Sequence, residues 1–125
     1  MKNRSLSARI AFAVAGWKAA WRRERSFRTQ SWFAALALLA LLMFRPPPIW
    51  WAVVAVTCAL VLALELINSA LEGLIDLLHP AIHPEIKAIK DMLAGAVLMI
   101  SCAALAVAAA LAVAYVHAVL QRFET

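Results

Sequence analysis

The sequence predicts an all-α integral membrane protein with three transmembrane helices and an N-terminal amphipathic helix on the membrane surface. Of its 125 residues, 66% are hydrophobic and the mean hydropathy is +0.84, far above what a soluble domain contains. Three apolar runs are separated by proline-containing loops, and eight of the twelve Lys and Arg precede residue 29. A chain this short forms one domain, so we expect a single membrane-embedded unit over residues 1–125.

Residues 1–25 form the predicted surface helix. Its apolar residues alternate with basic ones, and tryptophan is well suited to the headgroup region, where Trp17 and Trp21 would lie. A basic segment beside apolar spans meets anionic lipid headgroups, so we expect membrane lipids and no nucleic acid as partners. The basic residues are Lys2, Arg4, Arg9, Lys18, Arg22, Arg23, Arg25 and Arg28.

The first predicted span covers residues 26–44. Its apolar part, Trp32 to Phe44, has thirteen residues, whereas a span needs about 20, so the helix is expected to begin near Ser26. Three prolines at positions 46–48 then end it, because consecutive prolines cannot continue a helix.

The second and third spans flank a loop that contains two His-Pro pairs. The second is predicted over residues 49–78, with its last part polar, and the third over residues 85–119. The third is rich in Ala, and Gly95 near its start is expected to let a neighbouring helix approach closely. Cys58 and Cys102 both lie in apolar runs, where no structural disulfide is expected.

The distribution of cations predicts the orientation in the membrane. Ten of the twelve Lys and Arg lie in the first 28 residues or between positions 76 and 91, while the proline-rich loop carries only Arg45. The positive-inside rule then puts the N-terminus and the His-Pro loop at the cytoplasmic face.

Five polar residues follow one stripe of the second span: Glu65, Asn68, Ser69, Glu72 and Asp76. At about 100° per residue they fall within roughly 60° of Glu65. A polar seam between helices explains an amide and a hydroxyl but not three acids, and ionisable groups at this depth indicate function. Sixteen residues at about 1.5 Å each put Glu65 near the inner edge of a hydrocarbon core of about 30 Å.

This arrangement suits phosphoryl transfer to a lipid. A poorly solvated carboxylate suits a general base that takes a proton from an alcohol, and carboxylates farther out suit a Mg²⁺ ion that arrives with nucleotide phosphates. Lys87 and Lys90 can neutralise phosphate charge. With glycine only at positions 16, 73 and 95, the chain has no Walker A sequence and no Gly-rich kinase loop.

Residues 9–117 resemble the prokaryotic diacylglycerol kinase family. The motifs are E-L-I-N-S-A-L-E over residues 65–72, Lys90-Asp91, and G-W-K-A-A-W over residues 16–21 followed by Glu24. The resemblance implies ATP-dependent phosphorylation of diacylglycerol to phosphatidic acid. It also implies homotrimers in the bacterial cytoplasmic (inner) membrane, with active sites shared between protomers.

The resemblance also implies roles for single residues. Glu65 corresponds to the general base and Asn68 to an amide that organises the site, while Glu24 and Glu72 correspond to carboxylates that hold Mg²⁺ with ATP. The residues expected to contact the nucleotide are Lys90, Asp91, His83, Asp76 and Phe12.

Simpler interpretations stay open for several of these residues. Glu24 can form a surface ion pair with Arg23 or Arg28, Asn68 can bond between helices, and His83 can be an ordinary loop residue. The His-Pro loop resembles the undecaprenol kinase branch of the family more closely, so undecaprenol is the alternative substrate. A non-catalytic membrane adaptor is the alternative of another class, although such a protein has no need of costly acids in the membrane.

Overall fold

The computed structural model describes residues 3–81 and 83–125, so Lys2 of the basic segment and Ile82 of the loop lie outside the described residues. The described ranges contain four α-helices and no strand. They are α1 (Leu6–Arg23), α2 (Arg25–Phe44), α3 (Pro48–Leu78) and α4 (Pro84–Phe123). Helices α2, α3 and α4 are each long and apolar enough to cross a membrane. The prediction of an all-α fold with three candidate spans is therefore confirmed.

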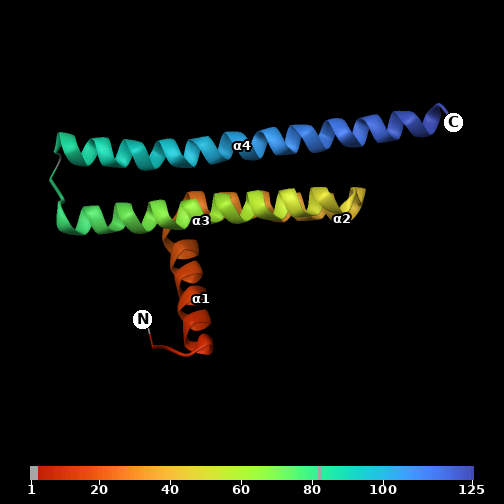
Figure 1. Cartoon of the computed structure of the whole chain (residues 1–125). Helices are drawn as coiled ribbons and strands as arrows, with labels where there is room; N and C mark the ends of the chain where they lie inside the picture. The colour runs from red at the N-terminus through yellow and green to blue at the C-terminus, as the bar shows by residue number, and fades with distance from the viewer. Residues whose placement is uncertain (1–2, 82) are drawn as a thin grey trace.

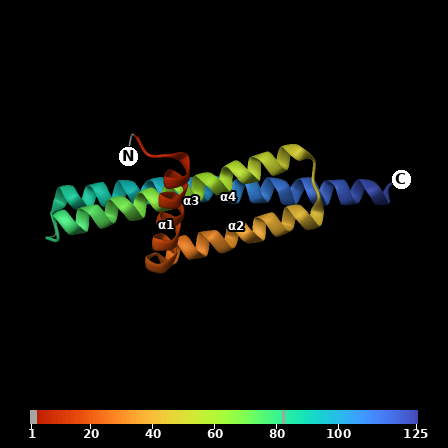
Figure 2. The ribbon, with the colours of Figure 1, turned by 90° about the horizontal axis from the view of Figure 1, so that it is seen from below.

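The three long helices lie side by side and α1 crosses them. Helix α4 runs antiparallel to α3 and extends beyond the connection between α2 and α3, while α2 lies against the first half of α3 (Figure 1). Seen from below, α1 crosses the other helices close to the middle of α3 (Figure 2). A helix at this angle can lie on a membrane surface while the other three span it.

Side-chain contacts set the start of α1 and the corner between α1 and α2. Ser5 caps the start of α1 by accepting a hydrogen bond from the Ala8 N–H, and α1 ends where Glu24 adopts an extended conformation. The Arg28 guanidinium then donates to the Trp21 carbonyl oxygen at 2.6 Å, which satisfies one of the last carbonyls of α1. Trp21 also packs edge-on against Trp32, with ring centroids 6.1 Å apart, so α2 holds the end of α1 in place.

The proline-rich connection turns the chain from α2 into α3. Arg45 ends α2 in the left-handed conformation, with φ of 46°, and Pro48 begins α3, where its missing N–H costs nothing. Phe44 at the end of α2 lies against Tyr115 of α4, with ring centroids 4.3 Å apart. This aromatic contact ties the far end of α2 to α4.

Helix α4 departs from expectation in two ways. It continues to Phe123, four residues past the predicted end at 119, and its last two turns include a contact of 3.1 Å between His117 and Gln121. A Cβ atom at Gly95 would meet no atom within 4 Å, so the expected close helix approach at Gly95 is wrong within this chain. Helix α4 packs mainly on α3 and buries none of its residues, which leaves Gly95 facing open space.

The buried core is very small. The buried apolar residues are Ala20, Phe27, Leu41, Val54 and Val61, and most large apolar side chains are exposed. Cys58 and Cys102 are free thiols, as expected. Exposed apolar surface on this scale must be covered by lipid or by further protein chains, because water would make it costly.

Candidate functional site

Glu65 is the one buried charged residue among the described positions, with 3% of its surface exposed. It lies on α3 opposite the first turn of α2, and the Ser26 hydroxyl donates a hydrogen bond to its Oε2 atom at 3.1 Å. No hydrogen bond reaches its Oε1 atom from the described part of the chain. One carboxylate oxygen is therefore held by Ser26, and the other has no hydrogen-bond partner among the described residues.

The next turn of α3 carries two buried oxygens without partners. Asn68 Oδ1 and Ser69 Oγ are both shielded from solvent and make no hydrogen bond within residues 3–81 and 83–125. A buried polar atom left unpaired costs about 1–3 kcal/mol. These two oxygens therefore mark the place beside Glu65 where a ligand or another chain would supply a partner.

Glu24 and Glu72 are both half-buried. Glu24 lies in the α1–α2 corner, two residues before Ser26, and forms no ion pair in the described structure. Its expected alternative partner Arg28 binds the end of α1 instead. Glu72 lies two turns beyond Glu65 on α3, roughly 10 Å along the helix.

The donor set fits a magnesium ion that arrives with a nucleotide. No group of three or more His, Cys, Asp or Glu side chains is positioned to hold a metal within the ranges that the structure describes. Mg²⁺ is usually bound by one or two carboxylates together with substrate phosphates, not by a complete set of protein ligands. Glu72 and the unpaired amide oxygen of Asn68 are hard oxygen donors on the same helix as Glu65, and Glu24 lies two residues before Ser26, whose hydroxyl bonds to Glu65.

An open hollow of about 250 Å³ lies where α3 ends and α4 begins. Two ion pairs border it: Lys90 Nζ lies 2.5 Å from Asp76 Oδ1, and Lys87 Nζ lies 2.6 Å from Asp91 Oδ2. The structure thus brings together four of the five residues expected to contact the nucleotide. They are Asp76, His83, Lys90 and Asp91, and all four line this hollow.

His83 borders this hollow, whereas Phe12 lies on α1, away from it. His83 caps α4, because its Nδ1 atom accepts the Glu85 N–H at 3.1 Å, so a structural hydrogen bond occupies this ring nitrogen. Phe12 does not line the hollow. It is exposed on α1, where the Arg4 guanidinium lies 5.0 Å from its ring centroid.

The contact with Asp76 makes the protonated form of Lys90 more favourable. The hydrogen bond that the Lys90 ammonium donates to Asp76 raises the pKa of Lys90 above its usual value, partial burial opposes this, and the charges of Asp76 and Glu72 raise the pKa further. Because the pKa is higher in the folded state, the pair stabilises the fold fully below the ordinary lysine pKa. That stabilisation is lost as the pH rises through the folded-state value.

We therefore expect Asp76→Asn to lower the apparent Tm at neutral pH but not in strong alkali. The difference in Tm between wild type and variant should shrink above about pH 10.4, the ordinary pKa of lysine, as the pH approaches the higher pKa of Lys90 in the folded state. Thermal unfolding followed by circular dichroism in detergent between about pH 7 and pH 11.5 measures this. Glu124→Gln, at the far end of α4, serves as the control. A Tm difference that persists undiminished in alkali would show that Asp76 stabilises the helix ends by another contact.

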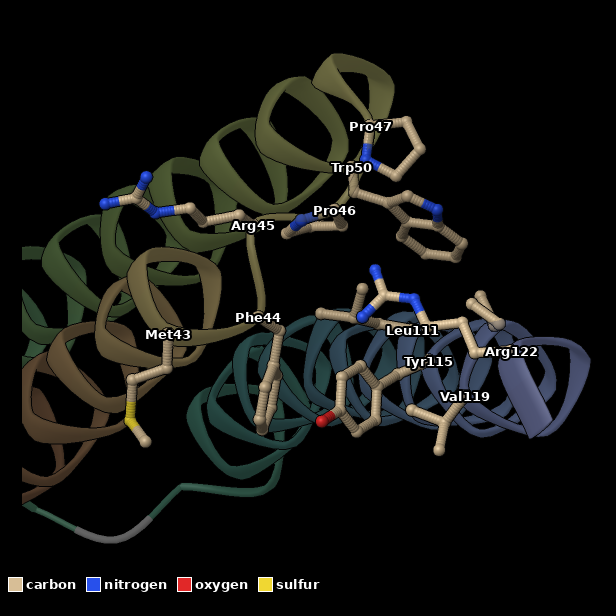
Figure 3. A pocket seen from close by; sticks show the side chains of 12 residues that line it. Met43, Phe44, Arg45, Pro46, Pro47, Trp50, Leu111, Tyr115, Val119 and Arg122 are labelled. Atoms are coloured by element: carbon tan, nitrogen blue, oxygen red, sulfur yellow. The ribbon is translucent and has the colours of Figure 1, made fainter.

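A second hollow, of about 270 Å³, lies at the opposite end of the helices. Residues of the α2–α3 connection and of the last turns of α4 line it, and the side chain of Arg122 extends beneath Pro46 and Trp50 while that of Arg45 points away (Figure 3). Trp50 and Glu72 are 22 residues apart on α3, roughly 33 Å along its axis. No carboxylate lines this hollow, and it lies too far from Glu65 to share its chemistry.

Ser26 is the site residue that the sequence did not identify. A serine in the first turn of a helix ordinarily bonds to nearby backbone groups, so its presence there predicts only a helix start. Its contact with Glu65 depends on the packing of α2 against α3, for which residue spacing carries no signal.

Residues 11–112 match the family model for prokaryotic diacylglycerol kinase. The chain belongs to this family. The match includes the α1–α2 corner, the polar stripe of α3 and the Lys90-Asp91 pair. The resemblance stated from the motifs alone is therefore confirmed.

Relatives in the prokaryotic diacylglycerol kinase family carry two different substrate names. The chain is 36% identical to a diacylglycerol kinase of Synechocystis sp. over 104 residues, which cover 82% of this chain and 59% of that relative. It is 35% identical to an undecaprenol kinase of Bacillus subtilis over 89 residues, 69% of this chain and 72% of the relative. A diacylglycerol kinase of Helicobacter pylori is 29% identical over 90 residues, 72% of this chain and 70% of the relative. Both diacylglycerol and undecaprenol are therefore consistent with membership of this family.

Proposed function

We propose that this protein is a membrane-embedded lipid kinase that transfers the γ-phosphoryl group of ATP to the hydroxyl of diacylglycerol, giving phosphatidic acid and ADP. The observation that carries the proposal is the buried Glu65, held through one oxygen near the middle of the candidate span α3, in a chain of this family. A buried carboxylate is costly, and without a function for its charge an apolar residue would serve better there.

Glu65 is the proposed general base. Its free oxygen, Oε1, accepts the proton of the lipid hydroxyl as the lipid oxygen forms its bond to the γ-phosphorus and the bond to the ADP oxygen breaks. The neighbouring Asn68 amide presents a buried oxygen without a protein partner, which supports a role in organising the bound reactants. Phosphoryl transfer depends mainly on such positioning and on charge stabilisation.

Glu24 and Glu72 would hold the magnesium ion of Mg-ATP. The ion would neutralise part of the phosphate charge, and the two half-buried carboxylates are of the hard-oxygen type that Mg²⁺ prefers. The proposal gains support from Glu24, which is not engaged in an ion pair in the described residues.

The hollow between α3 and α4 is the proposed binding place for the nucleotide. Lys87 and Lys90 supply its positive charge, and each is held by one carboxylate. A phosphate group that binds Lys90 has to compete with Asp76, so we propose that Asp76 orients Lys90 until the nucleotide arrives.

We further propose a homotrimer in the bacterial cytoplasmic membrane, with the N-terminus at the cytoplasmic face. The distribution of Lys and Arg supports this orientation. The small buried core and the unpaired oxygens of Asn68 and Ser69 support a neighbouring protomer that completes the site.

The choice of lipid is tested by direct comparison of the two substrates. Purified protein in mixed micelles is given diacylglycerol and undecaprenol in turn with Mg-ATP and radiolabelled γ-phosphate. We expect kcat/KM for diacylglycerol to exceed that for undecaprenol. The reason is that the Arg-rich surface helix and the sequence around Glu24 resemble the diacylglycerol kinase branch.

The opposite order would favour the second candidate function, an undecaprenol kinase. The His-Pro loop and the Bacillus subtilis relative support that candidate. Transfer to neither lipid, in micelles where a known lipid kinase is active, would instead support the non-catalytic adaptor.

A further inference from the structure

Ser26 differs from the other hydroxyl residues of α2 in where its side chain is bonded. Thr29 donates to the Arg25 carbonyl at 3.1 Å and Ser31 to the Phe27 carbonyl at 2.8 Å, both within their own helix. The Ser26 hydroxyl instead crosses to α3 and donates to Glu65 Oε2 at 3.1 Å, between residues 39 positions apart. A serine in a first helical turn has local backbone groups available, so this cross-helix bond is a specific feature.

The bond gives a buried side chain its one polar partner among the described residues. A glutamate has three rotatable bonds, and a carboxylate beside hydrocarbon finds few other donors. A hydrogen bond to a charged acceptor is stronger than one between neutral groups, so a single hydroxyl can set the orientation of the carboxylate. With Oε2 engaged, Oε1 is the oxygen that remains for a reacting hydroxyl.

Ser26 lies between the buried Glu65 and the surface of the protein. Glu65 is buried, whereas Ser26 is exposed at the start of α2. The hydrogen bond therefore joins a buried carboxylate to an exposed residue of the α1–α2 corner, which also contains Glu24.

We propose that Ser26 is a positioning residue that holds Oε2 of Glu65 and thereby directs Oε1 toward the lipid hydroxyl. This inference rests on the proposed function, because it takes Glu65 as the base. Ser26 itself transfers no proton and binds no phosphate. It acts on the rate of transfer through the geometry of Glu65, since a misplaced catalytic group lowers turnover without weakening substrate binding.

Three variants in the full chain test this inference. Ser26→Ala removes the donor, Ser26→Thr keeps a hydroxyl, and Ser31→Ala removes a hydroxyl of the same helix that bonds only to its own backbone. We expect Ser26→Ala to lower kcat by about 10-fold to 100-fold, with KM for lipid and for Mg-ATP unchanged. Ser26→Thr should recover most of the turnover, and Ser31→Ala should match wild type.

The outcomes separate positioning from a structural role. Wild-type kcat in Ser26→Ala overturns the inference, and so does an equal loss in Ser26→Ala, Ser26→Thr and Ser31→Ala, because that result would reflect helix packing. If Ser26→Ala fails to fold by circular dichroism, Ser26→Cys replaces it: its weak S–H donor should give turnover between that of wild type and that of Glu65→Gln, and wild-type turnover would again overturn the inference. An inactive wild type would refute the proposed function itself, whereas an active wild type with an unaffected Ser26→Ala refutes only the role of Ser26.

Discussion

Glu65→Gln is expected to lose nearly all turnover while the helices and the assembly stay intact. A general base contributes about 10²-fold to 10⁴-fold to a rate, and glutamine cannot accept the lipid proton. The substitution keeps the size of the side chain, and its amide oxygen can still accept the Ser26 hydroxyl. Removing a buried charge should leave the apparent Tm unchanged or raise it, because an ionised carboxylate is costly out of water. Steady-state kcat and thermal unfolding in the same detergent measure both effects.

Glu85→Gln provides the matched control for Glu65→Gln. Glu85 is exposed in the first turn of α4, does not line the hollow beside Asp76, and has no role in the proposed reaction. The control should retain wild-type turnover. If Glu65→Gln also retained most of its turnover, Glu65 would not be the base and the proposed reaction would need another proton acceptor.

Glu24→Ala and Glu72→Ala are expected to lower turnover and to raise the Mg²⁺ concentration required for half-maximal activity. Loss of one carboxylate ligand should raise that concentration by at least about 10-fold, since even indirect partners of a metal site change affinity by 10-fold to 100-fold. KM for lipid should not change, because neither carboxylate is proposed to contact the lipid that accepts the phosphoryl group. Rates measured over a range of Mg²⁺ at constant ATP give the result.

The Glu24 variant should fold normally. Although Glu24 lies between α1 and α2, its side chain makes no capping hydrogen bond, and its backbone conformation is accessible to alanine. Glu124→Ala, at the other end of the chain, is the control for loss of an acidic side chain. If both variants showed an unchanged Mg²⁺ requirement, Glu24 and Glu72 would have structural roles and the metal would be bound elsewhere.

Most of the helical architecture could be predicted from sequence. The lengths of the apolar runs, the three prolines and the two His-Pro pairs located α2, α3 and α4 with deviations of four residues or fewer. Helix boundaries of this kind depend on local properties, namely hydropathy, a fixed φ angle and missing N–H groups. The late end of α4 and the open surroundings of Gly95 escaped prediction because neither residue type nor spacing tells which face of a helix meets a neighbour.

The candidate site likewise has features that the sequence predicts and features that only helix packing determines. Helical periodicity and the motif resemblance are sufficient to identify Glu65, Asn68, Glu72 and Asp76 as one polar stripe. Periodicity does not reveal that the two ends of the stripe have different partners. Glu65 meets α2 through Ser26, and Asp76 meets α4 through Lys90.

The amino-acid sequence was sufficient for the class of protein, the order of its helices and the chemical character of the stripe, because each follows from interactions within a few turns of one helix or between a helix and lipid. The packing of the helices set the pairings that give the stripe its chemistry. Ser26 and Glu65 are 39 residues apart, Asp76 and Lys90 are 14 apart, and Arg28 bonds across the corner to the end of α1. Such contacts depend on how helices lie against one another, and no local pattern of residues specifies that geometry.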